Sequence, residues 1–144
     1  MPQSGSDYPS QDPPGTRLAI IAESLYLANL LLVPGFAFII LMVVFFKHRK
    51  ETPPTPPLAL SHLQQTLSAS LWAGVLLVLV NLFIVLMGGY SGPNTWMAVI
   101  IYFTLCHSTL ILIGMFGLAK ALAGKCFRYP LIGRALPAGC KGML

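Results

Sequence analysis

LSASLWAGVLLVLVNLFIVLMGGYSGPNTWMAVIIYFTLCHSTLILIGMFGLAKAL, residues 67–122, decides the fold of this chain. Its two apolar runs, 67–87 and 95–121, are each long enough to cross the roughly 30 Å hydrocarbon core of a bilayer as a helix. The glycine-rich sequence 88–94 between them is typical of a tight turn. Residues 52–119 contain no Lys, Arg, Asp or Glu. The stretch therefore predicts two membrane-spanning helices joined as a hairpin.

The composition of the whole chain favours lipid over water as its solvent. Of the 144 residues, 56% are hydrophobic and 9% are charged, whereas about a quarter of the residues of ordinary globular proteins are charged. A soluble domain of this size would have too few polar side chains to cover its surface. Most basic residues lie in short clusters that flank the apolar runs, without the interleaved aromatic residues of a nucleic-acid groove. The sequence predicts an all-α integral membrane protein with no nucleic-acid partner.

A further hydrophobic segment, residues 17–46, precedes the hairpin. As one helix it would be roughly 45 Å long, which exceeds the hydrocarbon core. Pro34-Gly35 in its middle predicts a kink. Two arrangements fit: one long kinked span, or an interfacial segment at 17–31 followed by a short span at 34–46. We prefer the single kinked helix, which makes three spans in all.

Three regions follow from this pattern. Residues 1–16 are rich in Pro, Ser, Gly and Gln, which predicts a disordered tail, and they lack the basic start of a secretory signal peptide. Residues 17–134 form the three-span membrane domain, in which the prolines of 53–57 favour a stiff connection before the second span. Residues 135–144 form a short basic C-terminal tail.

Basic residues predict the orientation. They follow the first and third spans and are absent from the turn at 88–94. The positive-inside rule therefore predicts a multi-pass protein of the bacterial inner membrane with its N-terminus outside and its C-terminus in the cytoplasm. Cys126 and Cys140 fall in that cytoplasmic tail, so both are expected to be reduced thiols. The side chains expected at lipid headgroups are Lys47, Arg49, Lys50, Lys125, Arg128, Tyr129 and Trp96.

Polar residues in the apolar segments are candidates for a function. Glu23 lies six residues after Arg17, and we expect it at the interface, satisfied by water or by that arginine. His107, Ser108 and Thr109 form a polar patch in the third span, with Asn81 of the second span as a partner. We favour an interhelical hydrogen bond of His107 over a ligand or proton-relay role.

Haem chemistry is disfavoured by the depths of the histidines. His107 is near the midplane, whereas His48 and His62 are expected at the cytoplasmic edge, about 15 Å away. His107 could bind a cofactor only together with a histidine of a partner protein. No cofactor, metal site or catalytic residue is predicted, because four acidic residues leave almost nothing for carboxylate catalysis and no nucleophile or metal motif occurs. The chain is not expected to be an enzyme.

Two short motifs carry a family resemblance: HLQQTL at 62–67, which opens a span, and AKALAGKCFRYPL at 119–131, which closes the next. Residues 25–134 resemble a family of small bacterial membrane proteins without an assigned function, related to the channel subunit of the chloroplast inner-envelope protein translocon. Its members commonly have H-x-K-x-A before a span and a Y-R-Y-P-like ending. Here Gln64 and Ser68 stand where a basic residue and Asn are usual. The resemblance implies a helical membrane fold and no established activity.

Three functions remain open, and we rank them. The first is a non-catalytic accessory or assembly subunit of a larger inner-membrane complex, because small residues at Ser70-xxx-Gly74 and Gly114-xx-Gly117 let helices approach closely. The second is an oligomeric transporter, channel or translocon-like component, lined by His107, Ser108, Thr109 and Asn81. The third is a subunit that supplies His107 to a redox cofactor. The expected partners are the lipid bilayer and a membrane protein or further copies of this chain.

Overall fold

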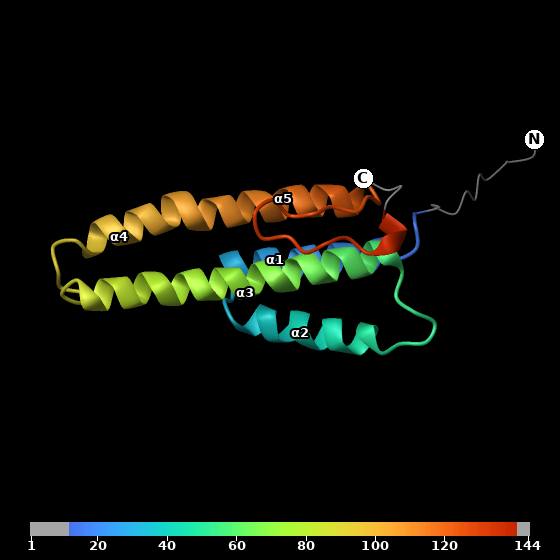
Figure 1. The fold of residues 1–144 in the computed structure, drawn as a ribbon, viewed down its shortest axis with the longest axis horizontal. Helices are drawn as coiled ribbons and strands as arrows, with labels where there is room; N and C mark the ends of the chain where they lie inside the picture. Colours follow the sequence, from blue (N-terminus) through green and yellow to red (C-terminus); the bar gives the residue numbers. More distant parts are fainter. Residues whose placement is uncertain (1–11, 141–144) are drawn as a thin grey trace, which may run out of the picture.

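The computed structural model describes residues 12–140, and within them it is helical, without strands. The predicted all-α class is therefore confirmed for this range. The predicted tail at 1–16 and the end of the C-terminal tail fall largely outside the described residues. The elements are α1 (Thr16–Leu31), α2 (Phe36–Arg49), α3 (Pro57–Leu86), α4 (Thr95–Ile101), the π-helix η1 (Tyr102–His107), α5 (Ser108–Leu122) and the 3-10 turn η2 (Ala138–Cys140) (Figure 1).

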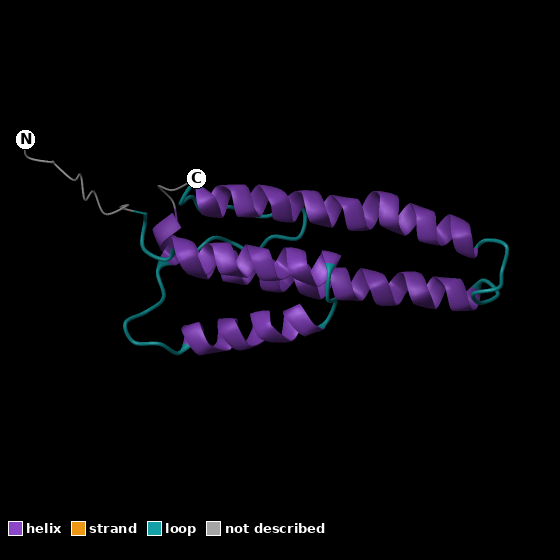
Figure 2. Ribbon diagram, turned by 180° about the vertical axis from the view of Figure 1, so that it is seen from behind, coloured by secondary structure: helices purple, strands orange, loops and turns teal. Residues whose placement is uncertain are grey.

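The long hairpin is present. α3 has 30 residues, and the continuous helix Thr95–Leu122, made of α4, η1 and α5, has 28; these two helices are long and apolar enough to cross a membrane. They lie side by side and antiparallel (Figures 1 and 2). α3 ends where Gly88 takes a φ of 112°, which a side chain would disfavour, and the Thr95 hydroxyl donates to Gly89 O at 2.8 Å as the next helix begins.

The prediction of one kinked helix at 17–46 is wrong. α1 ends at Leu31, the chain reverses, and α2 returns antiparallel to α1, so that Leu18 near the start of α1 packs against the hydrophobic cluster that contains Phe45 near the end of α2. Gly35 provides the reversal with a φ of 87°, and its N–H donates to Asn29 Oδ1 at 2.9 Å. Pro34-Gly35 is thus a turn. With 16 and 14 residues, the two helices are about 24 and 21 Å long, too short to span separately.

α1 and α2 cover only one part of the hairpin (Figures 1 and 2). We call this part the packed half: it comprises α1, α2, residues 57–73 of α3, residues 110–122 of α5 and the C-terminal segment 123–140. The remaining residues 74–109 form the extended half, in which the two long helices have only each other as neighbours. All three hydrophobic clusters lie in the packed half, centred on Ala19, on Ala22 and on Tyr26.

The C-terminal segment 123–140 folds back along α3 and α5 (Figure 1). Leu136 packs against the hydrophobic cluster of Ala19, and Cys126 and Cys140 form a disulfide. The expectation of reduced thiols is therefore wrong for this pair, because the fold-back brings two residues 14 positions apart within bonding distance. The first part of the predicted basic tail, 135–140, belongs to the packed half.

Both described ends of the chain lie at the same end of the bundle. A Cβ added to Gly124 would come within 2.8 Å of Pro13 Cγ. The predicted N-terminus outside with the C-terminus inside does not agree with this geometry. The physical reason is the reversal at Pro34-Gly35, which returns the chain to its starting end before α3 begins.

Candidate functional site

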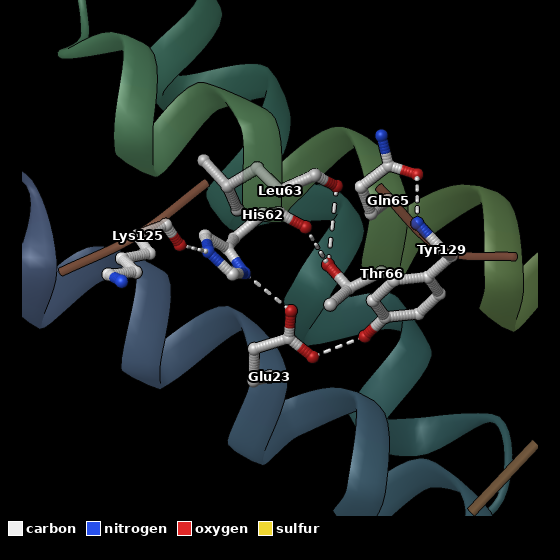
Figure 3. Close-up of polar contacts among 7 residues, drawn as sticks. All are labelled: Glu23, His62, Leu63, Gln65, Thr66, Lys125 and Tyr129. Carbon is white, nitrogen blue, oxygen red and sulfur yellow. Dashed lines mark hydrogen bonds and ion pairs between the residues drawn. The ribbon is translucent and has the colours of Figure 1, made fainter. Parts of the chain in front are cut away.

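Three ionisable or hydroxyl side chains from separate elements meet in the centre of the packed half (Figure 3). Glu23 comes from α1, His62 from α3 and Tyr129 from the C-terminal segment, and each is at most 1% exposed. We call them the Glu–His–Tyr cluster. Their sequence separations of 39 and 106 residues mean that only the completed fold brings them together.

The hydrogen bonds of the cluster fix most of its protons. His62 Nε2 lies 3.0 Å from Lys125 O, and a carbonyl only accepts, so Nε2 carries a proton. The Tyr129 hydroxyl donates to Glu23 Oε2. One further proton lies between His62 Nδ1 and Glu23 Oε1, which are 2.6 Å apart. Whether that proton belongs to the imidazole or to the carboxyl, the cluster carries no net charge.

Residue spacing on the helices explains why these groups face one another. His62, Thr66, Ala69 and Ala73 are buried at intervals of three or four residues on α3, and α1 buries Ala19, Ala22, Glu23 and Tyr26 in the same way. Such intervals place residues on one helix face. The alanines let the two helices approach closely, so that the longer polar side chains reach each other across the contact.

Two glycines of α5 make room for the cluster. A Cβ at Gly117 would lie 2.5 Å from Glu23 Oε2, and one at Gly114 would lie 2.6 Å from Tyr26 Cε1. The Tyr26 hydroxyl donates to Leu110 O at 3.0 Å, which ties α1 to α5. The predicted packing role of Gly114 and Gly117 is thus given a specific partner: each accommodates a side chain of α1.

A second set of polar side chains on α3 holds the C-terminal segment through its backbone. Gln65 Nε2 donates to Arg134 O at 2.7 Å, and Gln65 Oε1 accepts from Arg134 N at 3.0 Å. Ser68 Oγ donates to Ile132 O at 3.2 Å. These side chains of α3 therefore supply hydrogen bonds to residues 132–134, which lie in no helix and would otherwise need water as their partner.

Burial and the neighbouring Glu23 carboxylate raise the pKa of the Tyr129 phenol well above its usual value. Desolvation is the larger cause, because the phenolate would lose its hydration in the interior. Tyr129 consequently remains a neutral donor to Glu23 at all physiological pH values.

The structure corrects the surroundings of two side chains. Glu23 was expected to be satisfied by water or by Arg17, but its partners are His62 and Tyr129, and Tyr129, expected at the headgroups, is buried in the Glu–His–Tyr cluster. His62, expected at the cytoplasmic edge, is fully buried with them. Each is stabilised by partners from other elements. The other predicted headgroup residues are exposed: Lys47, Arg49, Lys50, Lys125, Arg128 and Trp96.

The predicted intramembrane polar residues lie in the extended half and do not converge. Asn81 donates to Leu77 O at 2.7 Å and accepts from the Tyr90 hydroxyl, so the predicted bond to His107 is not formed. The His107 ring lies 5.1 Å from the Phe103 ring, at the end of η1. Ser108 and Thr109 donate to carbonyls of their own helix at 2.8 and 2.6 Å, as hydroxyls in helices commonly do.

Chemically, the Glu–His–Tyr cluster is closed. Both imidazole nitrogens and both carboxylate oxygens are engaged, and nothing in residues 12–140 brings together three metal-ligating side chains. The arrangement is suited to fastening α1, α3 and the C-terminal segment. Sequence reasoning missed it, although a signal existed: the two motifs of the family resemblance, at 62–67 and 119–131, supply His62 and Tyr129.

Neither a protein-family model nor a curated protein nor a solved structure matches this chain significantly.

Proposed function

We propose that this protein is a non-catalytic accessory or assembly subunit of a larger complex in the bacterial inner membrane. The observation that carries the proposal is the extended half, whose apolar side chains have no cover from the chain itself. The consecutive residues Leu77, Val78 and Leu79 of α3 are all exposed. Because neighbouring helix positions point about 100° apart, these three residues expose a wide arc of α3, and only the face that carries Ala73, Leu76, Val80 and Ile84 is less exposed.

Small residues on the extended half offer a place for a partner helix. An added Cβ at Gly74 would have no atom within 4 Å, in contrast to the crowded glycines of α5. Ser70, one turn earlier, belongs to the packed half and is buried there, so the open surface of small residues begins at Gly74. In lipid, helices associate through close contact at small residues and through interhelical hydrogen bonds. Gly74 is therefore the centre of the proposed partner contact.

The packed half supports a platform role. Its buried polar side chains form hydrogen bonds that hold α1, α3 and the C-terminal segment together, and Glu23 and His62 are not exposed to water. A rigid half that orients a long hairpin suits a protein that assembles with others through its spans.

For the topology, we assign α3 and the helix Thr95–Leu122 as two full spans and α1–α2 as a hairpin of half that depth. Every Lys and Arg among residues 12–140 lies in the packed half or in the adjoining connection 50–56, which favours the cytoplasm for the end of the bundle away from the turn 88–94. The Cys126–Cys140 disulfide is the opposing argument, because disulfides persist in oxidising compartments.

The orientation is tested with fusions to bacterial alkaline phosphatase, which is active only outside the cytoplasm. We expect an inactive enzyme when it is fused to the C-terminus and an active enzyme when it is inserted at 88–94. The reverse pattern would place the end of the bundle away from the turn 88–94 outside the cytoplasm.

The partner is tested by purification of the tagged chain from bacterial membranes in mild detergent, with mass spectrometry of what accompanies it. We expect a defined partner set with the wild-type chain and its loss with Gly74→Leu, whose Cβ would meet no atom of the chain within 4 Å. Leu112→Phe, which adds bulk at an exposed position of the packed half, is the matched control and should retain the partners. A wild-type chain that emerges alone as a monomer would contradict the proposal.

A further inference from the structure

A pocket of about 320 Å³ opens at the basic end of the packed half. Its walls are the last turn of α2, the connection 50–56 and the first turns of α3, and Arg134 of the C-terminal segment closes one side. The polar side chains on it include His48, Arg49, Glu51 and Arg134, and Phe45 and Leu60 form its apolar part.

The charges in this pocket do not cancel. Glu51 Oε2 lies 3.8 Å from His48 Nε2, and apart from the buried His62–Glu23 pair this is the only such ion pair in residues 12–140. Arg49 and Arg134 consequently have no carboxylate partner in this range. Glu51 offsets one of the two arginine charges but pairs with neither guanidinium group, so the cavity keeps a positive excess and two donors suited to an anion that can accept several hydrogen bonds.

Arg134 is fixed in place, as a binding group should be. Gln65, which is fully buried, holds both its backbone N–H and its carbonyl, so the backbone contributes the anchor and the side chain is left for the pocket. Arg49 is the last residue of α2, where a cation is stabilised by the helix dipole. The two arginines thus reach the pocket from elements far apart in the sequence.

The apolar side of the pocket continues onto the outside of the bundle. Arg49 lines the pocket, and toward the turn it is followed on the same face of α2, at intervals of three or four residues, by exposed Phe46 and half-buried Met42 and Phe38. A cationic pocket next to an apolar helix face is suited to an amphiphilic ligand, whose phosphate lies in the pocket and whose acyl chain lies along the helix. A free anion would leave the apolar face unused.

We propose that this pocket binds the phosphodiester headgroup of an anionic phospholipid. Arg49 and Arg134 contact the phosphate, and an acyl chain lies along α2. The site rests on membrane insertion but not on the accessory role, because it is separate from the extended half and from Gly74. A chain that purifies without protein partners can still bind the lipid, so the two proposals fail independently.

The test is native mass spectrometry of the detergent-purified full chain, titrated with dioleoylphosphatidylglycerol and, separately, with dioleoylphosphatidylcholine. We expect retention of the anionic lipid and a loss of about tenfold or more in its affinity in the double variant Arg49→Gln/Arg134→Gln. The glutamine at 134 keeps the backbone bonds to Gln65. Lys125→Gln/Arg128→Gln removes the same charge from exposed positions outside this pocket and should bind within about twofold of wild type.

Three results would overturn the proposal. Equal losses in the two double variants would mean general attraction to a basic surface. Equal retention of the zwitterionic lipid would mean that the anionic headgroup is not recognised. Displacement of the lipid by millimolar inorganic phosphate, with phosphate itself retained on the chain, would make the pocket a site for the free anion.

Discussion

The packed half and the extended half are built on the same two long helices, yet they distribute polarity differently. In the packed half, α3 buries Ser61, His62, Gln65 and Thr66 while the outside of α2 exposes Phe36, Val43 and Phe46. In the extended half, exposed apolar side chains cover α3 with little buried beneath them. An apolar exterior over a polar interior reverses the pattern of water-soluble proteins. Both halves fit the membrane environment that we propose for this chain.

The difference has an energetic meaning. In lipid, apolar side chains gain little by leaving the surroundings for a protein interior, so a helix pair without polar contacts has little to hold it together. The packed half gains its cohesion from hydrogen bonds that would be costly to leave unmade in a low-dielectric interior. The extended half lacks such bonds between its two helices, and its cohesion is left to lipid or to a partner.

The largest effect is expected from breaking the Glu–His–Tyr cluster. His62→Ala leaves the Glu23 carboxyl buried without its imidazole, and we expect the packed half to lose about 3–5 kcal/mol of stability. Thermal unfolding in detergent, followed by circular dichroism, measures the change. Asn81→Ala is the matched control in the extended half and should cost under about 1 kcal/mol. Similar losses for the two variants would remove the distinction between the halves.

The second-largest effect is expected from a variant that detaches the C-terminal segment from α3. Gln65→Ala removes the side chain that bonds to both the N–H and the carbonyl of Arg134, at a cost of about 1–3 kcal/mol. Trypsin should then cleave after Arg128 and Arg134 faster than in the wild-type chain. Gln64→Ala, at the neighbouring position that bonds to neither group, should leave the cleavage rate unchanged. An unchanged rate in Gln65→Ala would show that other contacts hold the segment.

A pair of glycine variants compares crowding directly. Gly117→Ala places a Cβ against the Glu23 carboxyl, and we expect about 1–3 kcal/mol of destabilisation from overpacking. Gly74→Ala meets no atom within 4 Å and should be neutral or stabilising by up to about 1 kcal/mol. The difference in melting temperature between the two variants measures the contrast. A destabilising Gly74→Ala would mean that this position is not open in the folded chain.

The pH dependence tests the burial of Tyr129. Its phenol has a raised pKa in the folded chain, so the unfolded chain loses this proton first as the pH rises above about 10. The stability contribution is present below that pH and is lost above it, at about 1.4 kcal/mol per pH unit. Unfolding measured from pH 9 to 11 should show a shallower slope for Tyr129→Phe than for the wild type. Equal slopes would contradict the buried phenol.

The smallest effect is expected from the exposed hydroxyl at Thr109. It donates to Leu105 O of its own helix and contacts no other element by hydrogen bond, so Thr109→Val should change stability by no more than about 0.5 kcal/mol. Denaturation in detergent is the measurement. A loss of several kcal/mol of stability would indicate that Thr109 contacts another helix. This part of the extended half would then be packed against other elements.

The resemblance to the translocon-related family stays a prediction. Its two motifs nevertheless correspond to structure in this chain, because His62 from the first and Tyr129 from the second both contact Glu23. A short polar motif that opens an apolar helix can therefore mark a buried tertiary contact as well as a membrane surface. The prediction of surface positions for these residues failed because it weighed only their place along the sequence.

What the sequence by itself determined is the all-helical class, the two long apolar helices and their turn, since these depend on run length, the absence of charge and local glycine chemistry at 88–94. The tertiary structure alone decided that Pro34-Gly35 reverses the chain, that Cys126 meets Cys140 and that Glu23 is satisfied by His62 and Tyr129. Run length and charge act on neighbouring residues, and can be read locally. A buried polar group is stabilised by whichever partner the completed fold brings within hydrogen-bonding distance, and that partner can lie more than a hundred residues away.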